Sequence, residues 1–337
     1  MAYTAHLALS RRRVVKHAAA AVAAGLAAPS FLHIRSAYAA YPDRPVKIVV
    51  ANTPGGPSDL VGRMISAALQ QSTGKTFIVE NIGGAGGNIG MGDAAHAAGD
   101  GYTMLFASSS IVVNPSLYKK LPFDLNKDLI PVTKAGISPN SWLVNRDFPT
   151  KTMKELIDLM KASPGKLSVA SPGTGTTPSL SIELLKQELG VSFVTVPFAG
   201  GGPMTQSLLA GFTPIACGAI GNSVPMIKEG RIRALAITSN KRLATLPDVA
   251  TLDELGFKNQ QAETMTGVFV PAGTPRPTVD LLQKEISTIV RMPDVAARLL
   301  EFGVIPEGDS SADFAAYIEN EITKWKRVIE IGKIDKI

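Results

Sequence analysis

From residue 41 onwards, short apolar runs alternate with longer stretches whose apolar residues recur at helical spacing. Residues 46–51 form a β-branched, apolar run that predicts a buried strand. Apolar residues at 60, 61, 64, 65, 68 and 69 then form one face of a helix. This alternation predicts an α/β fold with largely parallel sheets. The expected strands are 46–51, 76–80, 103–107, 132–137, 142–145, 167–171, 192–196, 213–217, 232–238 and 266–270, and the expected helices are 59–72, 88–98, 152–163, 177–189, 203–210, 221–229, 276–291, 294–302 and 311–330.

The loop between the first strand and the first helix reads A-N-T-P-G-G-P-S-D-L over residues 51–60. Gly55 and Gly56 precede Ser58 and Asp59, which stand where a helix would be capped. A glycine loop that opens onto a helix N-terminus points backbone N–H groups at an anion, here a carboxylate. A capped strand-to-helix turn explains this stretch equally well when it is taken alone.

Three further predicted strands end in loops rich in glycine, serine and threonine. Strand 103–107 leads into Ser108-Ser109-Ser110, strand 167–171 into residues 172–177, and strand 192–196 into residues 197–203. Ligands of open α/β sheets bind at the carboxyl ends of the strands. The shared pattern therefore predicts one ligand cleft built from several loops.

Composition and charge narrow the class of protein. The chain has 337 residues, of which 45% are hydrophobic and 18% charged, so it is globular and long enough for two domains. Residues 1–39 carry five Lys or Arg residues and no acid, so the net charge of +6 falls to +1 (6 − 5) without them. A nearly neutral body without a basic tract gives no support to a nucleic-acid partner.

The N-terminal segment has the pattern of an export signal. Arg11, Arg12 and Arg13 precede an alanine-rich apolar run over 18–28, and Ala37 and Ala39 supply a small-residue cleavage site. The arginines resemble a twin-arginine signal, and the run is too short for a membrane anchor. We expect residues 1–39 to be a signal peptide cleaved near Ala39, and the mature protein to be periplasmic, soluble and monomeric.

Few residues that commonly take part in catalysis remain once the signal peptide is removed. His96 and Cys217 are then the sole histidine and cysteine, so neither a Cys/His zinc site nor a disulfide can form. The glycines of 83–90 fail the dinucleotide spacing and are expected to form a close-packed turn. We expect no metal and no cofactor. An exported enzyme that uses Asp59 and Asp93 as paired carboxylates is the weaker alternative.

Ordered motifs along the whole mature chain resemble the periplasmic solute-binding proteins of the tripartite tricarboxylate transporter system, the Bug family. The matching stretches include Tyr41-Pro42-Asp43-Arg44-Pro45, Pro54-Gly55-Gly56 with Ser58-Asp59, Gly84-Ala85-Gly86-Gly87-Asn88, Asp100-Gly101-Tyr102, Asn114-Pro115-Ser116-Leu117-Tyr118, Leu246-Pro247-Asp248 and Pro271-Ala272-Gly273-Thr274-Pro275.

The resemblance implies a two-domain Venus-flytrap fold with the ligand held in the cleft between the domains. Domain one would be 41–142 plus 265–337, and domain two 143–264. The protein would capture a small organic acid and deliver it to the membrane permease, or report it to a sensor in the alternative. The loop pattern and the resemblance together give the candidate ligand-binding residues Thr53, Pro54, Gly55, Gly56, Ser58, Asp59, Ser109, Ser110, Ser171, Gly173, Thr174, Gly175, Thr176, Thr177, Phe198, Gly201, Gly202 and Gly218.

Some positions depart from the family pattern. Gly218 stands where an Asp is frequent, which favours a plain organic acid over an amino acid. Phe198 and Met265 replace a tyrosine and a further aromatic residue and imply an apolar middle of the pocket. Cys217 is expected to be a buried small apolar residue.

Overall fold

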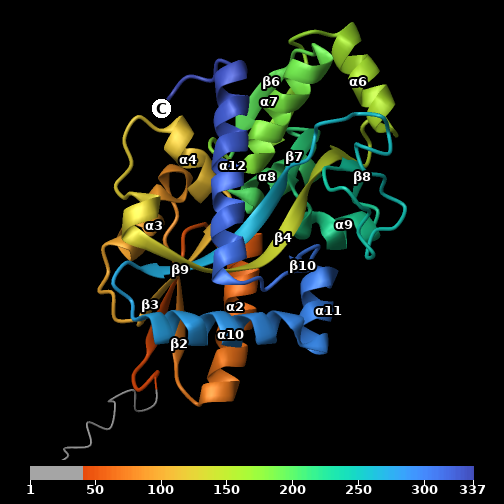
Figure 1. Cartoon of the computed structure of the whole chain (residues 1–337). Helices are drawn as coiled ribbons and strands as arrows, with labels where there is room; N and C mark the ends of the chain where they lie inside the picture. The colour runs from red at the N-terminus through yellow and green to blue at the C-terminus, as the bar shows by residue number, and fades with distance from the viewer. Residues whose placement is uncertain (1–40) are drawn as a thin grey trace, which may run out of the picture. The chain divides into compact units, whose positions relative to one another are not determined.

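The computed structural model describes residues 41–337, and the predicted signal peptide, residues 1–39, lies outside them. Three parallel strands in the order β2-β1-β3 form one end of the sheet, and Figure 1 labels β2 and β3 among them. Helix α2 follows β1 and packs on these strands. The elements of this part are β1 (Val46–Val50), α2 (Pro57–Thr73), β2 (Phe77–Asn81), η1 (Ala85–Gly87), α3 (Asn88–Ala95), β3 (Thr103–Ser108), α4 (Ser110–Leu117) and α5 (Leu125–Asp128).

Helix α2 begins and ends where the residue types favour it. Pro57 occupies the first helical position, where its missing N–H has no partner to lose. Gly74 ends the helix in the left-handed conformation, with φ of 66°, and its N–H donates to the carbonyl of Gln70. The apolar face predicted at 61, 65 and 69 is buried, so the helical periodicity is confirmed.

Two long antiparallel strands occupy the middle of the sheet. Strand β9 (Glu263–Pro271) lies between β3 and β4 (Leu129–Asn145). Strand β4 pairs with β9 as far as Pro139, with β7 from Asn140 onwards and with β8 from Ser141 onwards. It therefore changes partners at Pro139 and Asn140 and connects the two groups of strands.

The second group of strands consists of the end of β4 and the strands within residues 146–262. Strands β7, β5 and β6 continue the sheet in parallel, and β8 pairs with the end of β4. Its buried core includes Trp142, Phe193 and Cys217. The elements of this part are α6 (Met153–Ala162), β5 (Ser168–Ser171), α7 (Thr177–Leu189), β6 (Val194–Pro197), α8 (Gly201–Leu209), β7 (Ile215–Ala219), η2 (Ile220–Ser223), α9 (Val224–Lys228) and β8 (Ile232–Ile237).

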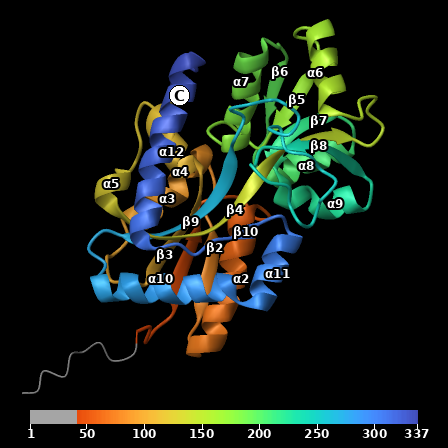
Figure 2. The ribbon, with the colours of Figure 1, turned by 45° about the vertical axis from the view of Figure 1, so that its right-hand side comes forward.

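The C-terminal elements return to the first group of strands. Helix α12 lies along α4, as Figure 2 shows from a second side, and buries Phe314 and Trp325. The last residue pairs with the end of α4, because Ile337 N–H donates to the Leu117 carbonyl over 2.9 Å. These elements are α10 (Arg276–Arg291), α11 (Pro293–Glu301), β10 (Ile305–Pro306) and α12 (Ser311–Ile331).

Three expectations about the elements need correction. The expected strands 132–137 and 142–145 are parts of one strand, β4. Helix α4, which has Pro115 inside it, follows the serine triplet and is not among the expected helices. The expectation of largely parallel sheets holds for the outer strands and is wrong for the centre, where β9 and β4 run antiparallel to their neighbours.

The glycines of 83–90 form the close-packed turn that the sequence predicts. A Cβ atom on Gly90 would lie 2.3 Å from the Ile82 carbonyl, and one on Gly87 would lie 2.7 Å from the Ala51 carbonyl. Real Cβ atoms do not approach backbone so closely, so packing against the end of β1 requires glycine here.

Cys217 is fully buried, as expected, and burial raises the pKa of its thiol.

Among residues 41–337, no helix combines the length and the apolar composition needed to cross a membrane.

Candidate functional site

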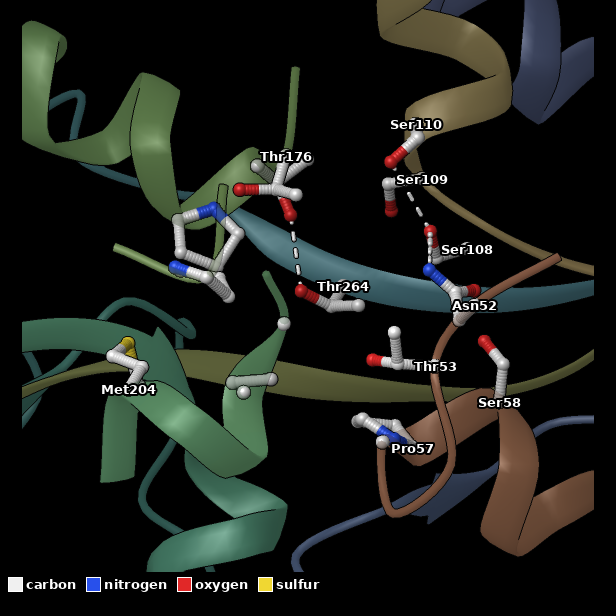
Figure 3. Close-up of a pocket in the computed structure, with 17 residues that line it drawn as sticks. Asn52, Thr53, Pro57, Ser58, Ser108, Ser109, Ser110, Thr176, Met204 and Thr264 are labelled. Carbon is white, nitrogen blue, oxygen red and sulfur yellow. Dashed lines mark hydrogen bonds between the residues drawn. The ribbon is translucent and has the colours of Figure 1, made fainter. Parts of the chain in front are cut away.

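A cavity of about 80 Å³ lies where loops of both strand groups meet (Figure 3). Its lining residues lie at the ends of β1, β3, β5, β6 and β7 and at the start of β9. The glycine-, serine- and threonine-rich loops that the sequence singles out after its strands therefore meet at one cavity. The lining residues are Asn52, Thr53, Gly56, Pro57, Ser58, Ser108, Ser109, Ser110, Pro172, Thr176, Thr177, Pro178, Gly200, Gly201, Met204, Ala219 and Thr264.

Four helices begin at this cavity. The residues before and at the start of α2, α4, α7 and α8 all line it, and each of these helices has at least eight residues. The first N–H groups of a helix lack partners within the helix, and its N-terminus carries about half an elementary positive charge. The cavity therefore combines backbone donors with a positive potential, which is the environment of a bound anion.

No lining residue carries a charged side chain. Hydroxyl groups and the carboxamide of Asn52 provide the polar side chains, and proline, alanine and methionine provide the apolar ones. An anion held here would be bound by neutral donors and helix ends without an opposing arginine or lysine.

Hydrogen bonds to strand β9 position the hydroxyl groups on the first side of the cavity. Ser109 Oγ donates to the Glu263 carbonyl over 3.1 Å and accepts from the Met265 N–H over 2.8 Å. Ser58 Oγ, at the start of α2, lies 3.2 Å from Thr266 Oγ1 of the same strand β9. These contacts hold the starts of α2 and α4 in place before any ligand arrives, which lowers the cost of ordering on binding.

A buried chain of hydrogen bonds positions the start of α7 on the other side. Thr177 Oγ1 lies 3.0 Å from Thr264 Oγ1, which in turn donates to Asn140 Oδ1 over 2.9 Å. Asn140 Nδ2 donates to Ser181 Oγ over 3.0 Å. Strands β4 and β9 thereby fix the orientation of helix α7 at the cavity.

Asp59 fixes the glycine loop and does not line the cavity. Its carboxylate accepts from the Gly55 N–H over 3.0 Å and from Asn81 Nδ2 over 3.0 Å, and it pairs with Arg63 Nε at 2.9 Å. Burial alone would raise the pKa of this carboxyl, but the bonds from Arg63, Gly55 and Asn81 outweigh it and lower the pKa. The carboxylate is therefore ionised and holds the loop. The expected cap position at Ser58 and Asp59 is wrong, because α2 begins at Pro57 and its N-cap residue is Gly56.

The structure brings eight of the predicted ligand-binding residues to this cavity: Thr53, Gly56, Ser58, Ser109, Ser110, Thr176, Thr177 and Gly201. Gly55, Asp59 and Gly202 face another hollow beside α8 and α9, which shares Gly56 and Pro57 with the cavity. Gly173, Thr174 and Phe198 line a larger hollow of about 530 Å³, which shares Asn52, Thr53, Ser110, Pro172, Thr176 and Gly200 with the cavity. Ser171 is buried, Gly175 packs against α4, and Gly218 packs against Met204. Pro54 lies beside these loops and is not among the lining residues of the cavity.

Sequence reasoning missed several lining residues, above all Thr264 and Met204. Thr264 belongs to a strand that returns from far along the chain, and no local pattern marks it. Met265, which was expected in the pocket, lies in the hydrophobic core, because neighbouring residues of a strand point to opposite faces. Ser108 and Gly200 belong to loops that the sequence does single out.

The residues of the enzymatic alternative do not form a catalytic pair. Asp93 pairs with Lys47 at 3.0 Å and faces another hollow, whereas Asp59 pairs with Arg63. Within residues 41–337 no three His, Cys, Asp or Glu side chains gather into a group that could hold a metal ion.

Solved structures of similar chains share this architecture. The periplasmic binding protein BugD is 32% identical, with a TM-score of 0.83 over 88% of this chain and 100% of its own. Rpa4515 of R. palustris, solved with adipate, is 30% identical, with a TM-score of 0.85 over 88% of this chain and 100% of its own. MatC (Rpa3494) of Rhodopseudomonas palustris, solved with bound malate, is 34% identical, with a TM-score of 0.79 over 86% of this chain and 100% of its own.

Sequence comparisons agree with the structural ones. A UPF0065 protein from the tcbD-tcbE intergenic region of Pseudomonas sp. strain P51 is 34% identical over 86% of this chain and 87% of its own length. The tripartite tricarboxylate transporter family receptor model matches residues 61–334. The chain therefore belongs to the tripartite tricarboxylate transporter receptor family, the Bug proteins, whose members are solute-binding receptors and not enzymes.

Proposed function

We propose that this protein binds a small organic carboxylate in the hydroxyl-lined cavity and delivers it to a membrane permease of the tripartite tricarboxylate type. The observation that carries the proposal is the meeting of four helix N-termini at a cavity without a charged side chain. Its relatives Rpa4515 and MatC, solved with adipate and malate, support a carboxylate ligand. The family supports the permease as partner, and BugD supports a periplasmic location.

Neutral donors are sufficient for a useful affinity. A hydrogen bond to a charged group contributes roughly 1.5–3 kcal/mol. A helix N-terminus adds about 0.3–1 kcal/mol, and a micromolar dissociation constant needs about 8 kcal/mol. Four to six such bonds supply this free energy and leave a surplus for ordering the loops.

The domain division 41–142 plus 265–337 and 143–264 remains part of the proposal. Two features support it: the change of partners in β4 at Pro139 and Asn140, and the position of the cavity between the two strand groups. In this proposal β4 and β9 are the hinge, and closure brings the starts of α7 and α8 towards those of α2 and α4.

The proposal is tested by thermal shift and calorimetry of the mature protein with mono-, di-, tri- and aromatic carboxylates. A ligand at 100 times its Kd stabilises the folded protein by about 2.7 kcal/mol, which raises the Tm measurably. Neutral sugars are the comparison set. Stabilisation by sugars but by no carboxylate contradicts the proposal.

Gly56→Val tests whether the first loop holds the ligand. A Cβ atom at Gly56 would meet nothing closer than the Thr53 carbonyl at 3.9 Å, so the fold accommodates it while the side chain enters the cavity. We expect loss of carboxylate binding in calorimetry with an almost unchanged Tm of the free protein. Ala67→Val, on the exposed side of the same helix, is the matched control and keeps full affinity. Full affinity of Gly56→Val would show that the loop is only a turn.

A further inference from the structure

Met204 forms the wall of the cavity on the side of α8. It lies in the first turn of that helix, is 2% exposed and stands across the cavity from Ser108 (Figure 3). The apolar residues Ala219, Pro172 and Pro178 line the cavity with it. The cavity thus has serine hydroxyl groups at the end of β3 and a thioether across from them.

The position of Met204 depends on Gly218. A Cβ atom at Gly218 would lie 2.5 Å from Met204 Cε and 3.4 Å from Met204 Sδ. Gly218 belongs to β7 and is not among the glycines of positive φ, so its backbone does not require glycine. The missing side chain instead leaves the space that the end of Met204 fills, and Gly218 itself is covered.

We propose that Met204 determines which carboxylates fit, by giving the cavity a movable, apolar wall above Gly218. This inference rests on the proposed function, because it assumes that the carboxylate of the ligand lies among the hydroxyl groups and helix ends. The opposite end of the ligand then packs against the thioether. A charged group there would lose its hydration against a thioether, which offers it no hydrogen-bond donor. The geometry therefore selects short acids whose far end is uncharged and apolar.

Methionine suits this role because it is unbranched and flexible, so it fills an irregular space without fixing its shape. Its truncation to alanine removes the atoms that occupy the space above Gly218. The enlarged cavity should then accept longer acids that the wild type excludes.

The first experiment measures the affinities of straight-chain monocarboxylates from acetate to octanoate, and of dicarboxylates of the same lengths, by calorimetry. We expect the wild type to prefer monocarboxylates and to lose affinity beyond a limiting length. Met204→Ala moves this limit to longer acids, with a gain of about fourfold for each added methylene group that the wild type excludes. Met204→Leu, which keeps most of the volume, retains the wild-type limit.

The second experiment uses the coupling between the two positions. Gly218→Ala pushes the end of Met204 into the cavity and is expected to lower the affinity for the best monocarboxylate at least tenfold. The double variant Gly218→Ala with Met204→Ala recovers that affinity, because the displaced atoms are absent. Met160→Ala is the control for lost stability. It truncates a methionine that is fully buried in the core around Trp142 and Phe193 and that lines no part of the cavity.

The outcomes separate the inference from the proposed function. If no carboxylate of any class stabilises the wild type, the proposed function is wrong. If carboxylates bind but Met204→Ala keeps the wild-type length limit, the role of Met204 is wrong and the proposed function stands. A preference of the wild type for dicarboxylates, or additive effects in the double variant, also overturns the role of Met204.

Discussion

Single residues at this site divide into those that face the cavity and those that hold the others in place. Asp59 belongs to the second kind, although its position beside Ser58 and Gly56 suggests a ligand contact. Its side chain is 8% exposed and accepts bonds from the loop, from Asn81 and from Arg63. An ionised carboxylate beside an anion site is tolerated because these donors already neutralise it.

We expect Asp59→Asn to destabilise the protein by about 1–3 kcal/mol, because the substitution weakens the bond from Gly55 and removes the ion pair with Arg63. Urea unfolding at pH 7 measures the free-energy change. Asp147→Asn, at a side chain that is 85% exposed, is the control and should change stability little.

The same variant tests the pH dependence. The pKa of Asp59 is lower in the folded protein than its usual value, so its ionised form stabilises the fold above about pH 4. This stabilisation is lost as the pH falls through the lowered folded pKa. Between pH 6 and pH 2 the wild type should therefore lose more unfolding free energy than Asp59→Asn, and parallel curves would contradict the lowered pKa.

Whole elements are placed at the cavity by buried polar contacts between them. Asn140, fully buried at the partner change of β4, links Thr264 on β9 to Ser181 on α7. Buried hydrogen bonds of this kind fix one arrangement of the elements, since every alternative leaves a polar group without a partner.

Asn140→Ala is expected to lower the unfolding free energy by about 2 kcal/mol, because Thr264 and Ser181 each lose a buried partner. It should also weaken carboxylate binding, since Thr264 and Thr177 line the cavity. Chemical denaturation and calorimetry measure the two effects. Asn126→Ala, at an exposed position of α5, serves as the control, and equal effects of the two substitutions would contradict the role of Asn140.

Element prediction succeeded where the apolar periodicity is strong. Helices 177–189 and 276–291 have the predicted bounds, because each has a clear face and a proline in its first turn. It failed for α4, whose eight residues are mostly buried on all sides and therefore show no amphipathic period. Because α4 was missed, the sequence predicted only three of the four helix N-termini at the cavity.

At the scale of the whole molecule, the two strand groups approach each other through glycines. A Cβ atom at Gly175 would lie 2.9 Å from Asn114 Oδ1, and one at Gly200 would lie 2.3 Å from Thr53 Oγ1. Asn114 cannot easily move aside, because it is fully buried and its amide donates to the Gly86 carbonyl and to Asn88. Glycine, which has no side chain, is therefore needed at these positions for the two groups of strands to lie this close together.

Gly175→Ala should hinder closure and reduce carboxylate affinity about tenfold, the equivalent of 1.4 kcal/mol. Gly190→Ala is the matched control, because Gly190 also has a positive φ, of 61° against 79°, but has nothing within 4 Å of its Cβ position. Calorimetry and small-angle X-ray scattering with saturating ligand compare the two. Equal affinity and equal compaction would show that Gly175 does not limit closure.

The class of fold and the kind of loop that lines the cavity could be predicted from local periodicity and glycine-rich turns, and the family from the order of its motifs. The loop at 51–60, the serines at 108–110 and the threonines at 176–177 were all identified in this way. The three-dimensional structure was needed to establish which of these side chains share a cavity, that Thr264 and Met204 complete it, and that Asp59 does not line it. Those facts depend on strand pairing and on contacts between residues far apart in the chain, for which a single sequence carries no local signal.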